Sequence, residues 1–149
     1  MSIIEDVLGA LRLAWDANDG AAWAASFTED ADFVDVLGRM QRGRETIAEE
    51  HQKIFDTIYR GSRAEFWPLS SYPLSGDGVS LAHTVSRLWV PSGPRSGVTF
   101  SVQTMVLERG LIRAFHNTIR ADMADFAEHD EVLAAQAPLQ WRQKTPPVG

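Results

Sequence analysis

Two residues that can exchange protons stand at positions where the sequence is otherwise apolar. Asp35 lies on the apolar face of a predicted strand over residues 31–37, and His51 lies in the apolar stripe of a predicted helix over residues 44–59. A carboxylate on an apolar face is costly without a purpose, and a carboxylate with an imidazole is suited to general acid–base catalysis. Structural explanations stay open: Asp35 could cap the turn at Gly38, and His51 could be a hydrogen-bonded core residue.

The elements that would position these residues are mostly helices first and strands afterwards. A capping box at Ser2 and the spacing of apolar residues predict helices over residues 2–18, 21–27 and 44–59. The predicted strands cover residues 31–37, 63–74, 79–90, 98–107 and 111–120. Pro68 and Pro73 cannot donate to a ladder, so the strand over 63–74 must be an edge or bulged strand. The turns are too short for crossover helices, which predicts an antiparallel sheet in an α+β layer fold.

The composition excludes several classes of protein. The chain has 149 residues and no cysteine, so disulfides, thiolate metal sites and cysteine nucleophiles are ruled out. A net charge of −6 argues against a nucleic-acid partner. No apolar run approaches the ~20 residues of a membrane span, and no secretory signal is visible. We therefore expect one cytoplasmic domain over residues 1–149, with a core over about 5–120 and a C-terminal extension over 121–149, and no membrane partner.

Cofactor and metal sites have no support in the sequence. No glycine-rich phosphate loop follows a predicted strand, so we expect no nucleotide or flavin cofactor. The histidines and acidic residues show no local spacing typical of metal ligands, so we expect no metal.

The order of the elements and several motifs together resemble a known superfamily. The motifs are Phe27-Thr28-Glu29-Asp30-Ala31, then Asp35 and Gly38, then Gly43-Arg44-Glu45-x-Ile47, and Phe115-His116-Asn117-Thr118 in the last strand. They resemble SnoaL-like members of the nuclear transport factor 2 and ketosteroid isomerase superfamily, and most closely the SgcJ/EcaC subgroup. Members of that subgroup often belong to natural-product pathways, enediyne pathways included. The resemblance implies a cone-shaped α+β fold in which three N-terminal helices pack on a curved antiparallel sheet around an apolar pocket.

The resemblance also implies roles for individual residues. Asp35 matches the catalytic carboxylate of ketosteroid isomerases, which would accept a proton, and His51 would donate a proton or assist Asp35. Leu11 stands where those isomerases have an oxyanion tyrosine, and Gln103 replaces their oxyanion aspartic acid. Gln103 can still donate a hydrogen bond to an enolate. The residues expected to line the pocket and contact the substrate are Trp15, Trp23, Phe27, Phe33, Met40, Phe55, Trp67 and Phe115.

The last hairpin decides which further donor faces the pocket. With a two-residue turn, Gln103 pairs with His116 and the two side chains share a face. With a three-residue turn, Gln103 opposes Phe115 and Asn117 faces the pocket. A one-residue slip exchanges the faces, so both His116 and Asn117 stay candidates. Asn117 is favoured because it would be the single polar group on an otherwise apolar face.

These observations favour a cofactor-independent isomerase, cyclase or dehydratase that acts on an apolar, carbonyl-bearing intermediate such as a polyketide or polyene. The missing oxyanion tyrosine keeps a second function open, the non-catalytic binding or carriage of a hydrophobic natural product. A third is an assembly module, because the fold also serves as an oligomeric hub. The expected partners are a small hydrophobic ligand and a second copy of the chain, since an exposed sheet face bearing Val, Leu and Trp predicts a homodimer.

Overall fold

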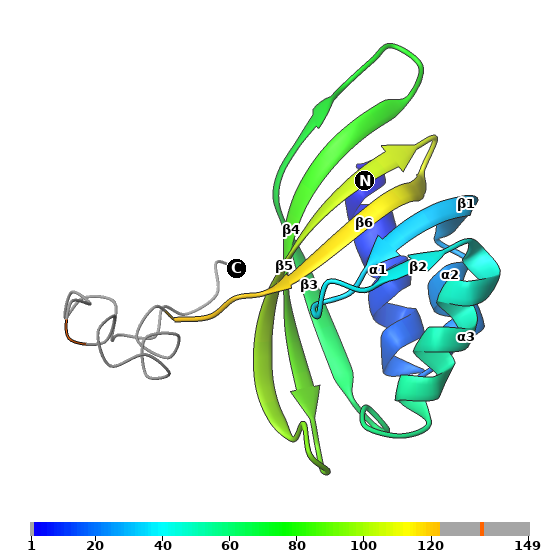
Figure 1. Ribbon diagram of the computed structural model, residues 1–149. Coiled ribbons are helices and arrows are strands. Elements are labelled where there is room, and N and C mark those ends of the chain that lie inside the picture. The colour runs from blue at the N-terminus through cyan, green and yellow to red at the C-terminus, as the bar shows by residue number, and fades with distance from the viewer. Residues whose placement is uncertain (1, 123–134, 136–149) are drawn as a thin grey trace.

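The computed structural model describes residues 2–122 and residue 135. The predicted extension over 121–149 therefore lies almost entirely outside the described residues. Three helices lie on one side of a curved six-stranded sheet (Figure 1). No helix in this part of the chain is both long and apolar enough to cross a membrane.

The helices follow the predicted pattern, but all three are shorter than predicted. Helix α1 covers Ile3–Asp16, α2 covers Gly20–Ala24 and α3 covers Arg44–Phe55. The capping box is confirmed, because the Ser2 hydroxyl accepts from the Glu5 amide and the Glu5 carboxylate accepts from the Ser2 amide. Two strands separate α2 from α3, so the helices are not consecutive at the N-terminus.

The first strand differs most from the prediction. Strand β1 covers Phe27–Val34 and β2 covers Met40–Arg42, so the segment 28–30, which lay between the predicted helix over 21–27 and the predicted strand over 31–37, is extended. The strand starts early because Phe27 pairs with the last strand of the sheet. Asp35 consequently lies just beyond β1, in the loop that leads to β2.

The remaining strands are long and form most of the sheet. Strand β3 covers Arg63–Pro73, β4 covers Val79–Val90, β5 covers Gly97–Glu108 and β6 covers Leu111–Ile119. Their order in the sheet is β2-β1-β6-β5-β4-β3. The prediction for the proline-containing strand is confirmed, since β3 is an edge strand and its register shifts between Pro68 and Ser70.

One pair of strands corrects the expectation of a wholly antiparallel sheet. Strands β1 and β6 are parallel, whereas the other neighbouring pairs are antiparallel. The chain between them contains α3 and four strands, which is long enough for the crossover that a parallel pair requires.

The last hairpin follows neither predicted register. Its turn has two residues, Arg109 and Gly110, both with positive φ. A register shift after the first two pairs then moves the partner of Gln103 by one position, from His116 to Asn117. The predicted pairings of Gln103 with His116 or Phe115 are therefore both wrong, because a bulge adds one residue to β6.

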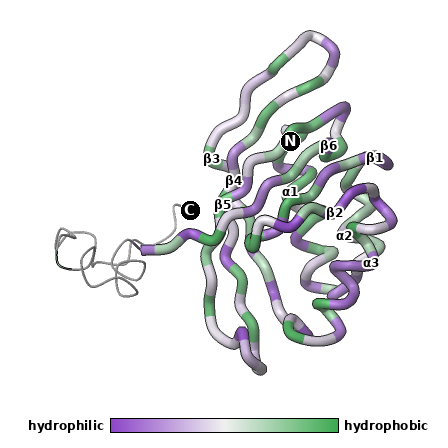
Figure 2. Tube along the Cα trace, viewed as in Figure 1, coloured by the Kyte–Doolittle hydropathy of each residue, from purple (hydrophilic) through white to green (hydrophobic). Residues whose placement is uncertain are grey.

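The core lies between the helices and the concave face of the sheet. Apolar residues of α1 and α3 repeat every three or four positions and pack against alternate residues of the strands, a pattern of alternating hydropathy that is visible along the sheet in Figure 2. The largest fully buried apolar side chains are Trp23, Phe27, Phe55, Leu11, Ile47, Met105, Leu107 and Ile112.

Candidate functional site

A cavity of about 160 Å³ lies between the concave face of the sheet and helix α3. Its inner end is aromatic, with Trp15, Trp23, Phe33, Phe66 and Phe115 among the lining residues. Its sheet side carries six uncharged polar residues, Gln41, Ser86, Thr99, Ser101, Gln103 and Asn117. Its mouth lies beside the loop after β1, because the exposed residues Leu37 and Arg39 also line it.

Asp35 is held at this mouth by the turn that follows β1. Its Oδ1 accepts from the amides of Leu37 at 2.9 Å and Arg39 at 3.0 Å, and its Oδ2 accepts from the Arg39 guanidinium at 3.0 Å. Its side chain is 16% exposed. Asp35 therefore caps the turn through Gly38, the structural role considered from the sequence, and it also lines the cavity.

His51 lies on the buried stripe of α3 and is 3% exposed. Its Nδ1 is 2.8 Å from the carbonyl oxygen of Ile47, one turn earlier in the helix. A carbonyl only accepts, so Nδ1 carries the hydrogen and Nε2 has a free lone pair in the neutral ring. Within the described residues, Nε2 has no hydrogen-bond partner. The ring stacks on Trp23 and meets Phe33 edge-on, with centroid distances of 5.2 and 4.7 Å.

This environment keeps the imidazole neutral. Burial lowers the pKa of His51 from its ordinary 6.5 to about 4, because the apolar surroundings disfavour the imidazolium ion. The bond to Ile47 and the negative charge of Asp35 act in the opposite direction but are weaker. Asp35 and His51 thus line one cavity and influence each other electrostatically, although no direct hydrogen bond joins the two side chains.

Gln103 does not present its amide to the cavity as a free donor. Its Oε1 accepts from Thr84 at 2.7 Å, and its Nε2 donates to Ser86 at 2.9 Å and to Asn117 at 3.0 Å. Both hydrogens of Nε2 are therefore already used, which argues against the predicted oxyanion role of Gln103. Thr84 and Asn117 are its direct cross-strand neighbours, so the hydrogen bonds follow from the register of β4, β5 and β6.

Two of the remaining donors of the cavity belong to partners of Gln103. The bond from Gln103 fixes Asn117 with Oδ1 as acceptor, and the two Nδ2 hydrogens have no partner among the described residues. The Ser86 hydroxyl accepts from Gln103 and keeps its own hydrogen for donation. Ser86 was not identified from the sequence. It could have been found as the small polar residue two positions after Thr84, on the same face of the strand.

Five predicted site residues do not line the cavity. His116 and Trp67 lie on the other face of the sheet, because side chains alternate along β6 and β3 and their neighbours Phe115 and Phe66 face inward. Met40 is 49% exposed on the edge strand β2. Phe27 and Phe55 are buried in the core instead. The other predicted lining residues, Trp15, Trp23, Phe33 and Phe115, do line the cavity.

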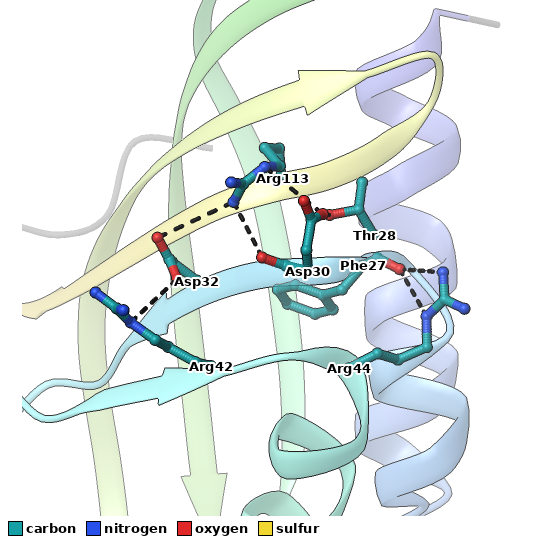
Figure 3. A network of polar contacts seen from close by, with 7 residues as sticks. All are labelled: Phe27, Thr28, Asp30, Asp32, Arg42, Arg44 and Arg113. Atoms are coloured by element: carbon teal, nitrogen blue, oxygen red, sulfur yellow. Dashed lines mark hydrogen bonds and ion pairs between the residues drawn. The ribbon is translucent and has the colours of Figure 1, made fainter.

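Part of the Gly-Arg-Glu motif has a structural explanation away from the cavity (Figure 3). Arg44 donates two hydrogen bonds, at 2.9 and 2.6 Å, to the carbonyl oxygen of Phe27, so it ties the start of α3 to the start of β1. Arg113 bridges β6 to Asp30 and Asp32 of β1, and Arg42 of β2 pairs with Asp32. This network holds the three strands together at the end of the sheet.

The described residues include no cluster of three His, Asp or Glu side chains that could hold a metal ion. Around a mainly apolar space, the site brings together a neutral imidazole acceptor, a carboxylate and hydrogen-bond donors that include Asn117 and Ser86. Such a set can accept a proton and stabilise a developing negative charge on oxygen.

No protein-family model matches the sequence, and no curated protein matches it significantly. Solved structures do match. A domain of unknown function with a cystatin-like fold from Nostoc punctiforme is 24% identical, with a TM-score of 0.76 over 93% of this chain and 87% of that chain. A ketosteroid isomerase-like protein from Erwinia carotovora atroseptica is 13% identical, with a TM-score of 0.66 over 80% and 95% of the two chains.

A hexachlorocyclohexane dehydrochlorinase (LinA) of type 2 is also similar, with 15% identity and a TM-score of 0.67 over 79% of this chain and 83% of that chain. Other matching structures are described as ketosteroid isomerase-like or nuclear transport factor 2-like. The fold is therefore the cone-shaped α+β fold that the sequence motifs predicted. Similarity at this level of identity establishes the fold alone.

Proposed function

We propose that this protein is a cofactor-independent enzyme that moves a proton on an apolar, carbonyl-bearing small molecule. The observation that carries the proposal is the unpaired Nε2 of neutral His51, which lies in the same cavity as Asp35 and the free hydrogens of Asn117 and Ser86. Among the similar folds, one is named as ketosteroid isomerase-like and one as a dehydrochlorinase, which supports an isomerase-type activity.

In this mechanism, Nε2 of His51 takes a proton from the carbon next to the substrate carbonyl. A base whose conjugate acid has a pKa of about 4 is about as strong as an ordinary carboxylate. The charge of Asp35 stabilises the imidazolium ion that forms. Asn117 Nδ2 and Ser86 Oγ donate to the enolate oxygen, and the proton then returns to a different carbon.

This assignment gives His51 the proton-accepting role that the sequence assigned to Asp35, and it leaves Asp35 as a fixed charge. His51 has no hydrogen on Nε2 at neutral pH, so it starts as the acceptor rather than the donor. The carboxylate of Asp35 already accepts three hydrogen bonds, which leaves it less available as the base.

The test uses exchange of the α-protons of 1-indanone for deuterium in D₂O at pD 7.4, followed by NMR. This probe is a compact ring ketone and reports proton abstraction whatever the natural substrate is. We expect the protein to accelerate this exchange. In His51→Gln, the acceleration should be at least about 100-fold smaller, which is the usual contribution of a general base. Asp35→Asn should lose about tenfold, since the amide oxygen still caps the turn but the charge is gone.

Asp32→Asn is the matched control, because Asp32 is a carboxylate of β1 that does not line the cavity. It should exchange indanone at the wild-type rate. A His51→Gln protein that folds normally and retains full acceleration would contradict the mechanism.

A second function, binding or carriage of a hydrophobic compound, is favoured by the engagement of Asp35 in its turn and of Gln103 in its network. The same experiment separates the two. A carrier would bind the ketone, seen as shifts of its NMR signals, and return it with its α-protons unexchanged.

The natural-product assignment also belongs to this proposal, and the SgcJ/EcaC-like motifs support it. A cavity of about 160 Å³ is close to the size that holds a single benzene ring in other proteins. A polyketide or polyene would thus place one ring or segment inside and extend through the mouth.

A further inference from the structure

The hairpin loop between β4 and β5 carries a cation that turns back toward the cavity. Arg95 is half-buried and lines the cavity, whereas every other residue of the segment 91–98 is exposed. Within the described residues, Arg95 has no hydrogen-bond or ion-pair partner. No hydrogen bond or ion pair within the described residues therefore explains its inward position.

The other charged groups that line the cavity are already paired. Asp35 forms its ion pair with Arg39 at 3.0 Å, and Glu50 forms one with Lys53 at 2.9 Å. His51 is neutral at physiological pH. Arg95 is consequently the uncompensated charge of the cavity, in a chain whose net charge is −6.

Removing a cation partly from water costs free energy unless an anion compensates it. The guanidinium group presents paired N–H donors in a planar fork, which matches the two oxygens of a carboxylate. Besides the aromatic residues, the apolar lining includes Ile54, Ile58 and Leu88. The site thus combines a cationic mouth, an apolar body and hydrogen-bond donors on the sheet.

We propose that the ligand of this cavity is an apolar carboxylic acid whose carboxylate pairs with Arg95 at the mouth. This inference rests on the proposed function only in taking the cavity as the substrate site. It adds the substrate class: an apolar body with a carbonyl near His51 and an anionic group at the opposite end.

The test measures binding and not turnover. The probes are 3-phenylpropanoate, 4-phenylbutanoate and 5-phenylpentanoate, each compared with its neutral amide by isothermal titration calorimetry at low salt. Three chain lengths cover different separations between the ring and the carboxylate. We expect at least one acid to bind about tenfold more tightly than its amide, the effect of one charge-assisted hydrogen-bonded pair.

Arg95→Gln should abolish this preference and leave the affinity for the amide within about twofold of wild type. Arg63→Gln is the control, because Arg63 is exposed, does not line the cavity and pairs with Trp89 near the same end of the sheet. It removes the same charge from the protein and should retain the preference. Thermal unfolding of both variants verifies that they are folded.

Three results would overturn the inference: equal binding of acids and amides, no detectable binding of any acid, or an unchanged preference in Arg95→Gln. Each of these leaves the proton-transfer proposal to its own test with indanone. Conversely, an acid preference that depends on Arg95 would stand even if His51→Gln exchanged indanone normally.

Discussion

His51 owes its chemical state to its immediate neighbours. The helix carbonyl of Ile47 fixes the tautomer, and the rings of Trp23 and Phe33 exclude water from the imidazole. Asp35, which lines the same cavity, has the opposite environment, since backbone amides and a guanidinium compensate its charge. The two groups therefore differ in the way that general acid–base chemistry requires, one free to accept a proton and one held as a fixed charge.

At the same scale, the buried imidazole should make stability depend on pH. The pKa of His51 is 6.5 when unfolded and about 4 when folded, so between these values the unfolded chain binds more protons. The free energy of unfolding is therefore highest above pH 6.5, and it decreases by up to about 3 kcal/mol as the pH falls toward 4. Between pH 6.5 and 4, we expect the free energy of unfolding, measured with urea, to decrease less in His51→Phe than in the wild-type protein. His116→Phe, at an exposed site, should behave as wild type, and parallel losses in all three proteins would refute the prediction.

At the scale of elements, α3 reaches its position through a close contact with α2. A Cβ atom on Gly20 would lie 2.4 Å from the carbonyl oxygen of Ala48 and 2.9 Å from the amide of Gln52, both backbone atoms. The Gln52 side chain in turn accepts from the Gly20 amide at 2.8 Å. The absence of a side chain at residue 20 therefore sets the distance between the two helices, and with it the depth of His51.

We expect Gly20→Ala to destabilise the protein by about 2 kcal/mol, because the two helices must move apart. Gly9→Ala in α1 is the matched control, since a Cβ there meets no atom within 4 Å. It should stabilise the helix by up to about 1 kcal/mol. Urea unfolding of the two variants measures both effects, and a Gly20→Ala protein as stable as wild type would show that the contact relaxes freely.

At the scale of the whole molecule, the outer face of the sheet remains to be covered. Trp89 and Val98 are directly paired across β4 and β5 and are 40% and 44% exposed. Tyr72, also half-exposed, pairs with Leu81 on the same face. An apolar surface of this kind favours association, so the homodimer expected from the sequence stays a prediction with this face as its interface.

Size-exclusion chromatography coupled to light scattering would test the predicted homodimer. We expect the wild-type protein to have twice the chain mass of 16.5 kDa, and Trp89→Glu to have the mass of a monomer because it places a charge in the interface. Leu13→Glu should remain dimeric, since Leu13 is exposed on α1, away from the sheet. A monomeric wild-type protein would refute the prediction.

Local signals in the sequence were sufficient for much of this architecture. The capping box at Ser2, the apolar spacing around His51 and the prolines of β3 act through neighbours within a few residues, so the helices, the edge strand and the buried imidazole could be predicted. The order of the motifs also indicated the cone-shaped fold, whereas Asp35 lies at the mouth of the cavity, in the loop after β1.

Only the tertiary structure decided how distant segments meet. The bulge in β6 pairs Gln103 with Asn117, and the parallel pairing of β1 and β6 starts the first strand at Phe27. Arg95 likewise lines the cavity together with Ile54 and Ile58, which are far from it in the chain. These features depend on contacts between residues far apart in the chain, and a shift of one residue in a strand exchanges its two faces. No local pattern could therefore determine which polar side chains face the cavity.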